Sequence, residues 1–262
     1  MNKRTCLIGF DEPELEELKS RISGPIVSHS TMPNYNVVAG ELFVDKESGG
    51  WQVPVDRVVF HGIFENDYDL FIALCLWGGN CFPNPLGMLN CRKKHACLVR
   101  ALSQTEFPGK NLGFVLAGNS VSVEDEQVAK WGDWHCGENK ERLIGEWEAP
   151  FASTLEPFIQ GQAVRVVLLG DEILQIHLEG VDWLKSIHDD TAGFMSVDPE
   201  LESDTRNLAK YFDLEVIAND YMIAENGSKY LLEVNHIPNV TRFPEIWKRY
   251  SQLVINWCEN IV

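Results

Sequence analysis

The sequence predicts an α/β protein that begins with a small domain built around a parallel sheet. Over roughly the first 80 residues, short apolar segments alternate with segments of helical periodicity, and this alternation favours parallel strands joined by helices. Further along, two turn signals, Gly170-Asp171 and Asn226-Gly227, separate runs of strand formers and predict antiparallel hairpins. With 262 residues and 45% hydrophobic content, the chain can form one large or two small domains.

The N-terminal elements are read in order from these patterns. A strand is expected at residues 5–10, and a helix follows from about Pro13, where Leu15, Leu18 and Ile22 lie on one stripe. Proline is well suited to a first helical turn. Further strands are expected at residues 25–28, 41–44 and 57–60, and a second helix at residues 67–77.

The first strand ends in a single glycine, Gly9, so the GxGxxG fingerprint of a dinucleotide site is absent. The turn-rich segment CFPNPLG, residues 81–87, marks the expected domain boundary. A helix at about residues 90–102 follows it. A basic cluster on this helix is either a solvated face or an anion site, and it consists of Arg92, Lys93, Lys94 and Arg100.

A strand is expected at residues 113–117, followed by the unusual segment AKWGDWHCGENK at 129–140. Its two glycines and the tryptophans Trp131 and Trp134 predict a flexible loop rather than core. The backbone N–H groups of such a loop can contact phosphates.

Two more features complete the pass along the chain. The hairpin at 161–180 carries Arg165 in an otherwise apolar strand, so an anion from the protein or from a ligand should pair with it. Helices are expected at about residues 205–212 and 244–259.

The hairpin DYMIAENGSKYLLEVN raises a question of charge. If Asn226 and Gly227 form a two-residue turn, Asp220 faces Glu233, and like charges about 5 Å apart destabilise a sheet. Asn235 points to the same face, and three oxygen-bearing side chains together suit Mg²⁺. The alternatives are a solvated hairpin end, or a loop one residue longer that separates the two acids.

Composition excludes several other classes. The formal net charge of −17 argues against nucleic acid as a partner. No apolar run approaches the ~20 residues of a membrane span, and the first residues lack a signal-peptide core. Seven cysteines form no CxxC pair, which predicts reduced thiols in a cytoplasmic protein and gives no support to a zinc site.

Taken in order, these features resemble the ATP-grasp superfamily, nearest the ribosomal-protein glutamate ligases and glutathione synthetases. YLLEVNHIPN, residues 230–239, is similar to the LEVN-x-x-P signature of those ligases. The resemblance implies a small Rossmann-like pre-ATP-grasp domain at residues 1–88. A two-subdomain ATP-grasp fold would follow at 89–262, with a lid at about 108–158.

The resemblance also implies an activity and its site. The expected enzyme is an ADP-forming ligase that uses ATP and Mg²⁺ to join a small-molecule or peptide carboxylate to an amine through an acyl-phosphate. The implied metal ligands are Asp220, Glu233 and Asn235. The implied nucleotide contacts are Lys94 or Lys93, Lys130, the hinge residues Glu156, Phe158 and Ile159, and Leu231 as the floor under the adenine. The implied catalytic residues are Arg165, Lys185 and Arg242.

The chain departs from those ligases in one segment. They carry Phe-Arg-x-Asn where this chain has DWLKSIH, so Leu184 and Ser186 replace the arginine and the asparagine, and Lys185 is the expected substitute. Arg242 would pair with a substrate anion or, alternatively, with Glu245. The competing functions are a small-molecule kinase and an inactive nucleotide-binding partner protein. The oligomeric state is open, and tryptophans in the last helix are compatible with a homodimer.

Overall fold

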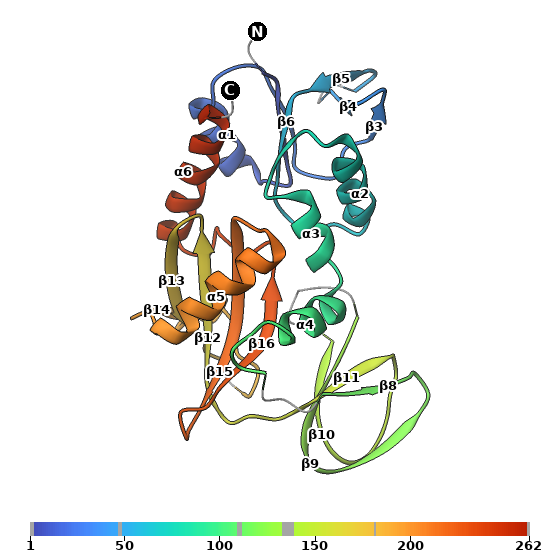
Figure 1. Ribbon diagram of the computed structural model, residues 1–262, viewed down its shortest axis with the longest axis vertical. Helices are drawn as coiled ribbons and strands as arrows, with labels where there is room; N and C mark the ends of the chain where they lie inside the picture. The colour runs from blue at the N-terminus through green and yellow to red at the C-terminus, as the bar shows by residue number, and fades with distance from the viewer. Residues whose placement is uncertain (1–2, 47–48, 109–111, 133–138, 181, 261–262) are drawn as a thin grey trace.

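The structure is a computed structural model that describes residues 3–46, 49–108, 112–132, 139–180 and 182–260. Figure 1 shows an N-terminal α/β unit at the top, a five-stranded sheet with its helices below it, and a small β-subdomain to one side. The long C-terminal helix lies beside the first helix of the chain. No strand is shared between these parts.

The N-terminal sheet is parallel, as the sequence predicted, with the strand order β2-β1-β6-β7. All residues of its two central strands are buried, which is typical of a parallel sheet covered on both faces. Its elements are β1 (Thr5–Ile8), α1 (Glu12–Arg21), β2 (Ile26–His29), β6 (Arg57–Phe60), α2 (Asp67–Trp77) and β7 (Asn80–Phe82). Gly78 ends α2 with a φ of 67°, which favours glycine.

Two parts of this half differ from the prediction. A separate antiparallel sheet is formed by β3 (Tyr35–Val38), β4 (Glu41–Asp45) and β5 (Gln52–Val55), of which only the middle strand was expected. The single helix predicted at 90–102 is two helices, α3 (Pro85–Cys91) and α4 (Lys94–Leu102). The chain turns between them where Arg92 pairs with the fully buried Asp67. The predicted domain boundary at residue 88 therefore falls within α3.

The small β-subdomain has the strand order β10-β9-β11-β8 and its own core around Ala129, Leu143 and Leu155. Its strands are β8 (Gly113–Val115), β9 (Ser120–Trp131), β10 (Lys140–Glu148) and β11 (Ser153–Pro157). The segment predicted to be a loop thus includes the end of β9 and the start of β10. Trp134 lies outside the described residues.

The large antiparallel sheet has the order β14-β13-β12-β15-β16 and is covered by helices on both faces. Val164 and Val166 belong to the same core as α5, whereas Val167 and Leu169 belong to the core of α6. The elements are β12 (Gly161–Leu169), β13 (Glu172–His177), β14 (Gly193–Met195), α5 (Pro199–Phe212), β15 (Val216–Ala224), β16 (Lys229–Asn235) and α6 (Pro244–Asn260). The predicted hairpin at 161–180 is confirmed.

Helix α6 joins the two halves of the molecule. The Trp247 ring lies 6.3 Å from that of Phe10, and the Trp257 ring lies 5.6 Å from that of Phe82. The tryptophans considered for a dimer contact are therefore used inside the subunit. Within the described part of the chain, no helix has the length and apolar character needed to cross a membrane.

Candidate active site

The β15–β16 hairpin brings Asp220 opposite Glu233, but not by the predicted route. Near the turn, Met222 faces Tyr230, one residue away from the predicted register. The N–H of Ala224 donates to the carbonyl of Ser228, so the turn holds three residues and not the predicted two. A β-bulge at the extra residue of β16 then restores the pairing of the acids.

The bulge reverses the side-chain direction of two leucines. Leu231 turns into the core and is fully buried, whereas Leu232 lines a pocket together with Met222. The prediction that Leu231 forms the floor under an adenine is therefore wrong, because a one-residue shift moves a strand residue to the opposite face. Leu232 faces the pocket instead.

The structure also corrects the reason given for a metal. Arg165 donates from Nε and Nη2 to the two carboxylate oxygens of Asp220, at 2.6 and 2.8 Å. The Lys94 ammonium lies 3.5 Å from Glu233. Because each acid already faces a cation, their repulsion does not require a metal ion.

Lys130 is held in the same region by an ion pair with strand β11. Its ammonium lies 2.6 Å from Glu156, whose side chain is almost fully buried in β11. Burial alone would lower the pKa of Lys130, but the charge and hydrogen bond of Glu156 outweigh it and raise that pKa above its ordinary value. Lys130 is therefore positively charged at neutral pH.

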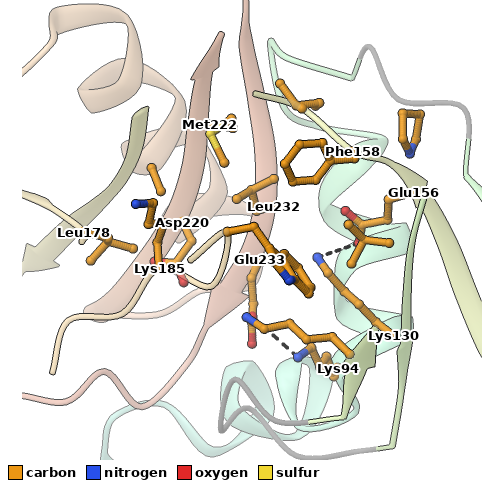
Figure 2. Close-up of a pocket in the computed structure, with 16 residues that line it drawn as sticks. Lys94, Lys130, Glu156, Phe158, Leu178, Lys185, Asp220, Met222, Leu232 and Glu233 are labelled. Atoms are coloured by element: carbon orange, nitrogen blue, oxygen red, sulfur yellow. Dashed lines mark ion pairs between the residues drawn. The ribbon is translucent and has the colours of Figure 1, made fainter. Parts of the chain in front are cut away.

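These groups line one end of a pocket with an empty volume of about 760 Å³, including its mouth. Figure 2 shows the pairs Lys130–Glu156 and Lys94–Glu233 on one side of this space and Phe158 and Met222 near its other end. The apolar wall is formed chiefly by Val128, Phe158, Ile159, Trp183, Met222 and Leu232. We call this space the apolar pocket, since most of its wall is apolar, as in most small-molecule sites.

A second cavity, the polar pocket, opens from the charged end of the first and has an empty volume of about 1150 Å³. The two cavities share Lys140, Leu178, Lys185, Asp220 and Glu233. The polar pocket adds Arg165 and Asn235 from the large sheet and the loop at 61–63 from the N-terminal sheet.

Most of the predicted site residues come together here. Lys94 faces the site, whereas the ammonium of Lys93 lies over the ring of Tyr68 at 5.9 Å. Lys185 lines both cavities, and its ammonium donates to the Gly180 carbonyl at 3.2 Å. Predicted residues on the wall of one or both pockets are Lys94, Lys130, Glu156, Phe158, Ile159, Arg165, Lys185, Asp220, Glu233 and Asn235.

Arg242 does not join this group. It lines neither pocket, and its guanidinium contacts the carbonyl of Asp189 at 3.4 Å and the carboxylate of Asp190 at 3.7 Å. Its side chain also lies over the ring of Phe243. The structure places Arg242 against the 189–190 segment, and its pairing with a substrate anion stays a prediction.

Sequence reasoning missed four residues around the site. Trp183 and Leu232 complete the apolar wall, Arg142 stacks on Phe158 at 4.0 Å, and Lys140 stands where the two pockets meet. Lys140 had a detectable signal, because a strand pair on either side of the glycine-bearing segment would have placed it opposite Lys130.

The residues present fit a magnesium ion bound together with phosphates. Among the residues described, no group of three or more His, Cys, Asp or Glu side chains is placed to hold a metal. Asp220, Glu233 and Asn235 offer carboxylate and amide oxygens, and Mg²⁺ is commonly held by one or two carboxylates plus substrate phosphates. Asn235 donates to Asp220 through Nδ2 at 3.5 Å, so its amide oxygen is not used in that contact.

No protein-family model matches the sequence, and no curated protein matches it. Solved structures do match over almost the whole chain. D-alanyl-alanine synthetase A from Vibrio cholerae superposes with a TM-score of 0.70 at 13% identity, covering 99% of this chain and 98% of the other. VanG D-Ala:D-Ser ligase from Enterococcus faecalis gives 0.67 at 15% identity, with 100% of both chains covered.

A third matching structure is named as an ATP-grasp ligase. The RiPP-associated ATP-grasp ligase from Chryseobacterium gregarium, in complex with ADP and with a leader and core peptide, gives a TM-score of 0.61 at 9% identity. The match covers 97% of each chain. Likeness at these identities concerns the fold, and it agrees with the sheets described above. The chain has the ATP-grasp fold.

Proposed function

We propose that this protein is an ATP-dependent carboxylate–amine ligase that releases ADP and forms an amide bond through an acyl-phosphate. One observation carries the proposal. The apolar pocket ends in lysines and paired acids, and those same groups open into the polar pocket. The ATP-grasp fold of the chain supports this assignment.

The nucleotide would be held by charge and apolar contact. Its base would enter the apolar wall near Phe158 and Leu232, and its phosphates would reach Lys94 and Lys130. Asp220, Glu233 and Asn235 would hold Mg²⁺, which when bound neutralises phosphate charge and polarises the phosphoryl group.

The charge of the site is opposite to that of the protein as a whole. The two pockets are lined by five Lys and Arg side chains and by three carboxylates, although the chain carries a net charge of −17. The cations are Lys94, Lys130, Lys140, Arg165 and Lys185, and the carboxylates are Glu156, Asp220 and Glu233. Anionic ligands are therefore favoured in this cleft and disfavoured over the rest of the surface.

The reaction follows from this placement. A carboxylate oxygen attacks the γ-phosphorus, the bond to the ADP oxygen breaks, and an acyl-phosphate forms. An amine then attacks the acyl carbon and inorganic phosphate leaves. The protein contributes orientation and fixed positive charge, which are the main sources of catalysis in phosphoryl transfer.

The substrates belong to the class of amino acids or peptides. The named neighbours include a D-Ala:D-Ser ligase and a ligase in complex with a peptide. In this chain the cations of the polar pocket suit a carboxylate. Lys185 would replace the arginine that is missing from the 182–188 segment, since it lines both pockets.

The test is ADP release from Mg-ATP with a panel of amino acids and short peptides as carboxylates and amines. Product formation should depend on both substrates, and hydroxylamine should trap the acyl-phosphate. Glu233→Gln should abolish turnover, whereas Glu202→Gln, on α5 and outside the lining of both pockets, should not change it. Phosphoryl transfer that hydroxylamine cannot intercept would indicate a kinase. Nucleotide binding with no turnover would indicate a binding protein, and no nucleotide binding would refute the proposal.

A further inference from the structure

Lys140 stands apart from the other cations of the site because it has no partner among the residues that the structure describes. It begins β10 and lies directly opposite Lys130 across the β9–β10 hairpin. Two like charges in that position repel. Lys130 is compensated by Glu156 at 2.6 Å, but Lys140 makes no hydrogen bond or ion pair within the described part of the chain.

The surroundings of Lys140 make its charge costly. Burial lowers the pKa of Lys140, and the positive charges of Lys130 and Lys94 lower it further. Glu233 and Asp220 act in the opposite direction without cancelling the effect. Since an uncompensated, half-buried cation is unfavourable, an anion bound at this point would be stabilised by relieving that cost.

The location of Lys140 indicates which part of a bound ligand would supply this anion. Of the two cations shared by both pockets, Lys185 already donates to the Gly180 carbonyl and lies 3.6 Å from Glu179. Lys140 is the other. Under the proposed function, a nucleotide with its base on the apolar wall and its inner phosphates near Lys94 and Lys130 would direct its terminal phosphate to the junction of the pockets.

We propose that Lys140 is a catalytic residue that contacts the terminal phosphate of the bound triphosphate. Its ammonium remains in contact with the phosphoryl group while that group is transferred to the substrate. This inference rests on the proposed function. In the step, a carboxylate oxygen forms the new bond to phosphorus while the bond to the ADP oxygen breaks and its electron pair leaves with ADP. No proton moves, and Lys140 remains an ammonium that offsets charge on the transferring group.

Binding measurements separate this role from a structural one. Affinities for Mg·ADP and for the non-hydrolysable triphosphate Mg·AMP-PNP are measured by calorimetry for the wild type, Lys140→Met and Lys140→Arg. Lys140→Met should lower the affinity for AMP-PNP by about 10- to 100-fold, which is the range expected for losing a hydrogen bond to a charged group. The affinity for ADP should fall by less than about 3-fold. Lys140→Arg should recover most of the loss. Lys248→Met, at an exposed site on α6, controls for the lost charge.

The outcomes are distinct. Equal weakening of both nucleotides, or no weakening of either, overturns the role of Lys140 while leaving the ligase proposal intact. Failure of the wild type to bind either nucleotide overturns both. If thermal unfolding shows that Lys140→Met is not folded, Lys140→Gln is measured in the same way, and retained preference for the triphosphate in that variant counts against the inference.

Discussion

Replacing Arg165 tests whether the cation on Asp220 is part of the framework of the site. Both side chains are largely buried, with exposed fractions of 15% and 12%, and both carboxylate oxygens of Asp220 accept from the guanidinium. Arg165→Met keeps most of the apolar volume but leaves Asp220 beside Glu233 without its partner. Removing one member of a buried pair costs about 3–5 kcal/mol. Because some exposure remains, we expect about 3 kcal/mol of lost unfolding free energy.

The loss is measured by urea denaturation and by thermal unfolding. In a chain of this size each kcal/mol lowers Tm by about 2–4 °C, so Arg165→Met should unfold about 6–12 °C earlier. The double variant with Asp220→Asn should recover much of the loss, since it removes the unpaired charge. Arg249→Met breaks an exposed ion pair with Glu172 and should cost less than about 1 kcal/mol. If Arg165→Met costs no more than this control and shows no coupling to Asp220→Asn, the structural role of the pair is wrong.

Two further predictions concern the hairpin and the mouth of the polar pocket. Leu232→Ala should weaken nucleotide binding in calorimetry with little change in the free energy of unfolding. Leu231→Ala should lower the free energy of unfolding by about 2–5 kcal/mol in urea denaturation and change nucleotide affinity by no more than a few-fold. The opposite pattern would contradict the bulge. Burial lowers the pKa of His61 from 6.5 to about 4, so the unfolded chain binds the extra proton first as the pH falls. Unfolding free energy should therefore drop between pH 6.5 and about 4 by up to about 3 kcal/mol, and His61→Phe should show a smaller drop over the same range.

The sequence was sufficient where local patterns determine the structure. The stretch at 57–60 is an arginine followed by three strand-forming apolar residues, and helix 67–77 is stopped by Gly78, so both elements were predicted at their observed bounds. The break between α3 and α4 was not predictable in this way. It depends on Arg92 reaching Asp67, a residue 25 positions earlier, and no local pattern records that contact.

The hairpin shows how a correct pair was predicted from a wrong register. The turn has one residue more than Asn226-Gly227 suggests, and the bulge at Leu232 compensates for it further along the strand. Asp220 and Glu233 meet because the two irregularities cancel. The side chains between them do not return to the predicted faces, and this is why the pairing of the acids was predicted correctly and the face of Leu231 was not. Bulges are set by packing on both faces of a sheet, which alternation within one strand does not reveal.

The charge pairs of the site favour the proposed nucleotide over a metal ion alone as its ligand. Asp220 is held by Arg165 and Glu233 lies near Lys94, so an isolated divalent ion at these oxygens would face two cations already in place. Phosphates reverse that balance, since they are attracted by Lys94 and Lys130 and supply further oxygen ligands to the ion. Within the described residues, Lys140 forms no ion pair with a carboxylate. The paired acids and the unpaired lysine therefore favour the same ligand, an anion that brings its own magnesium.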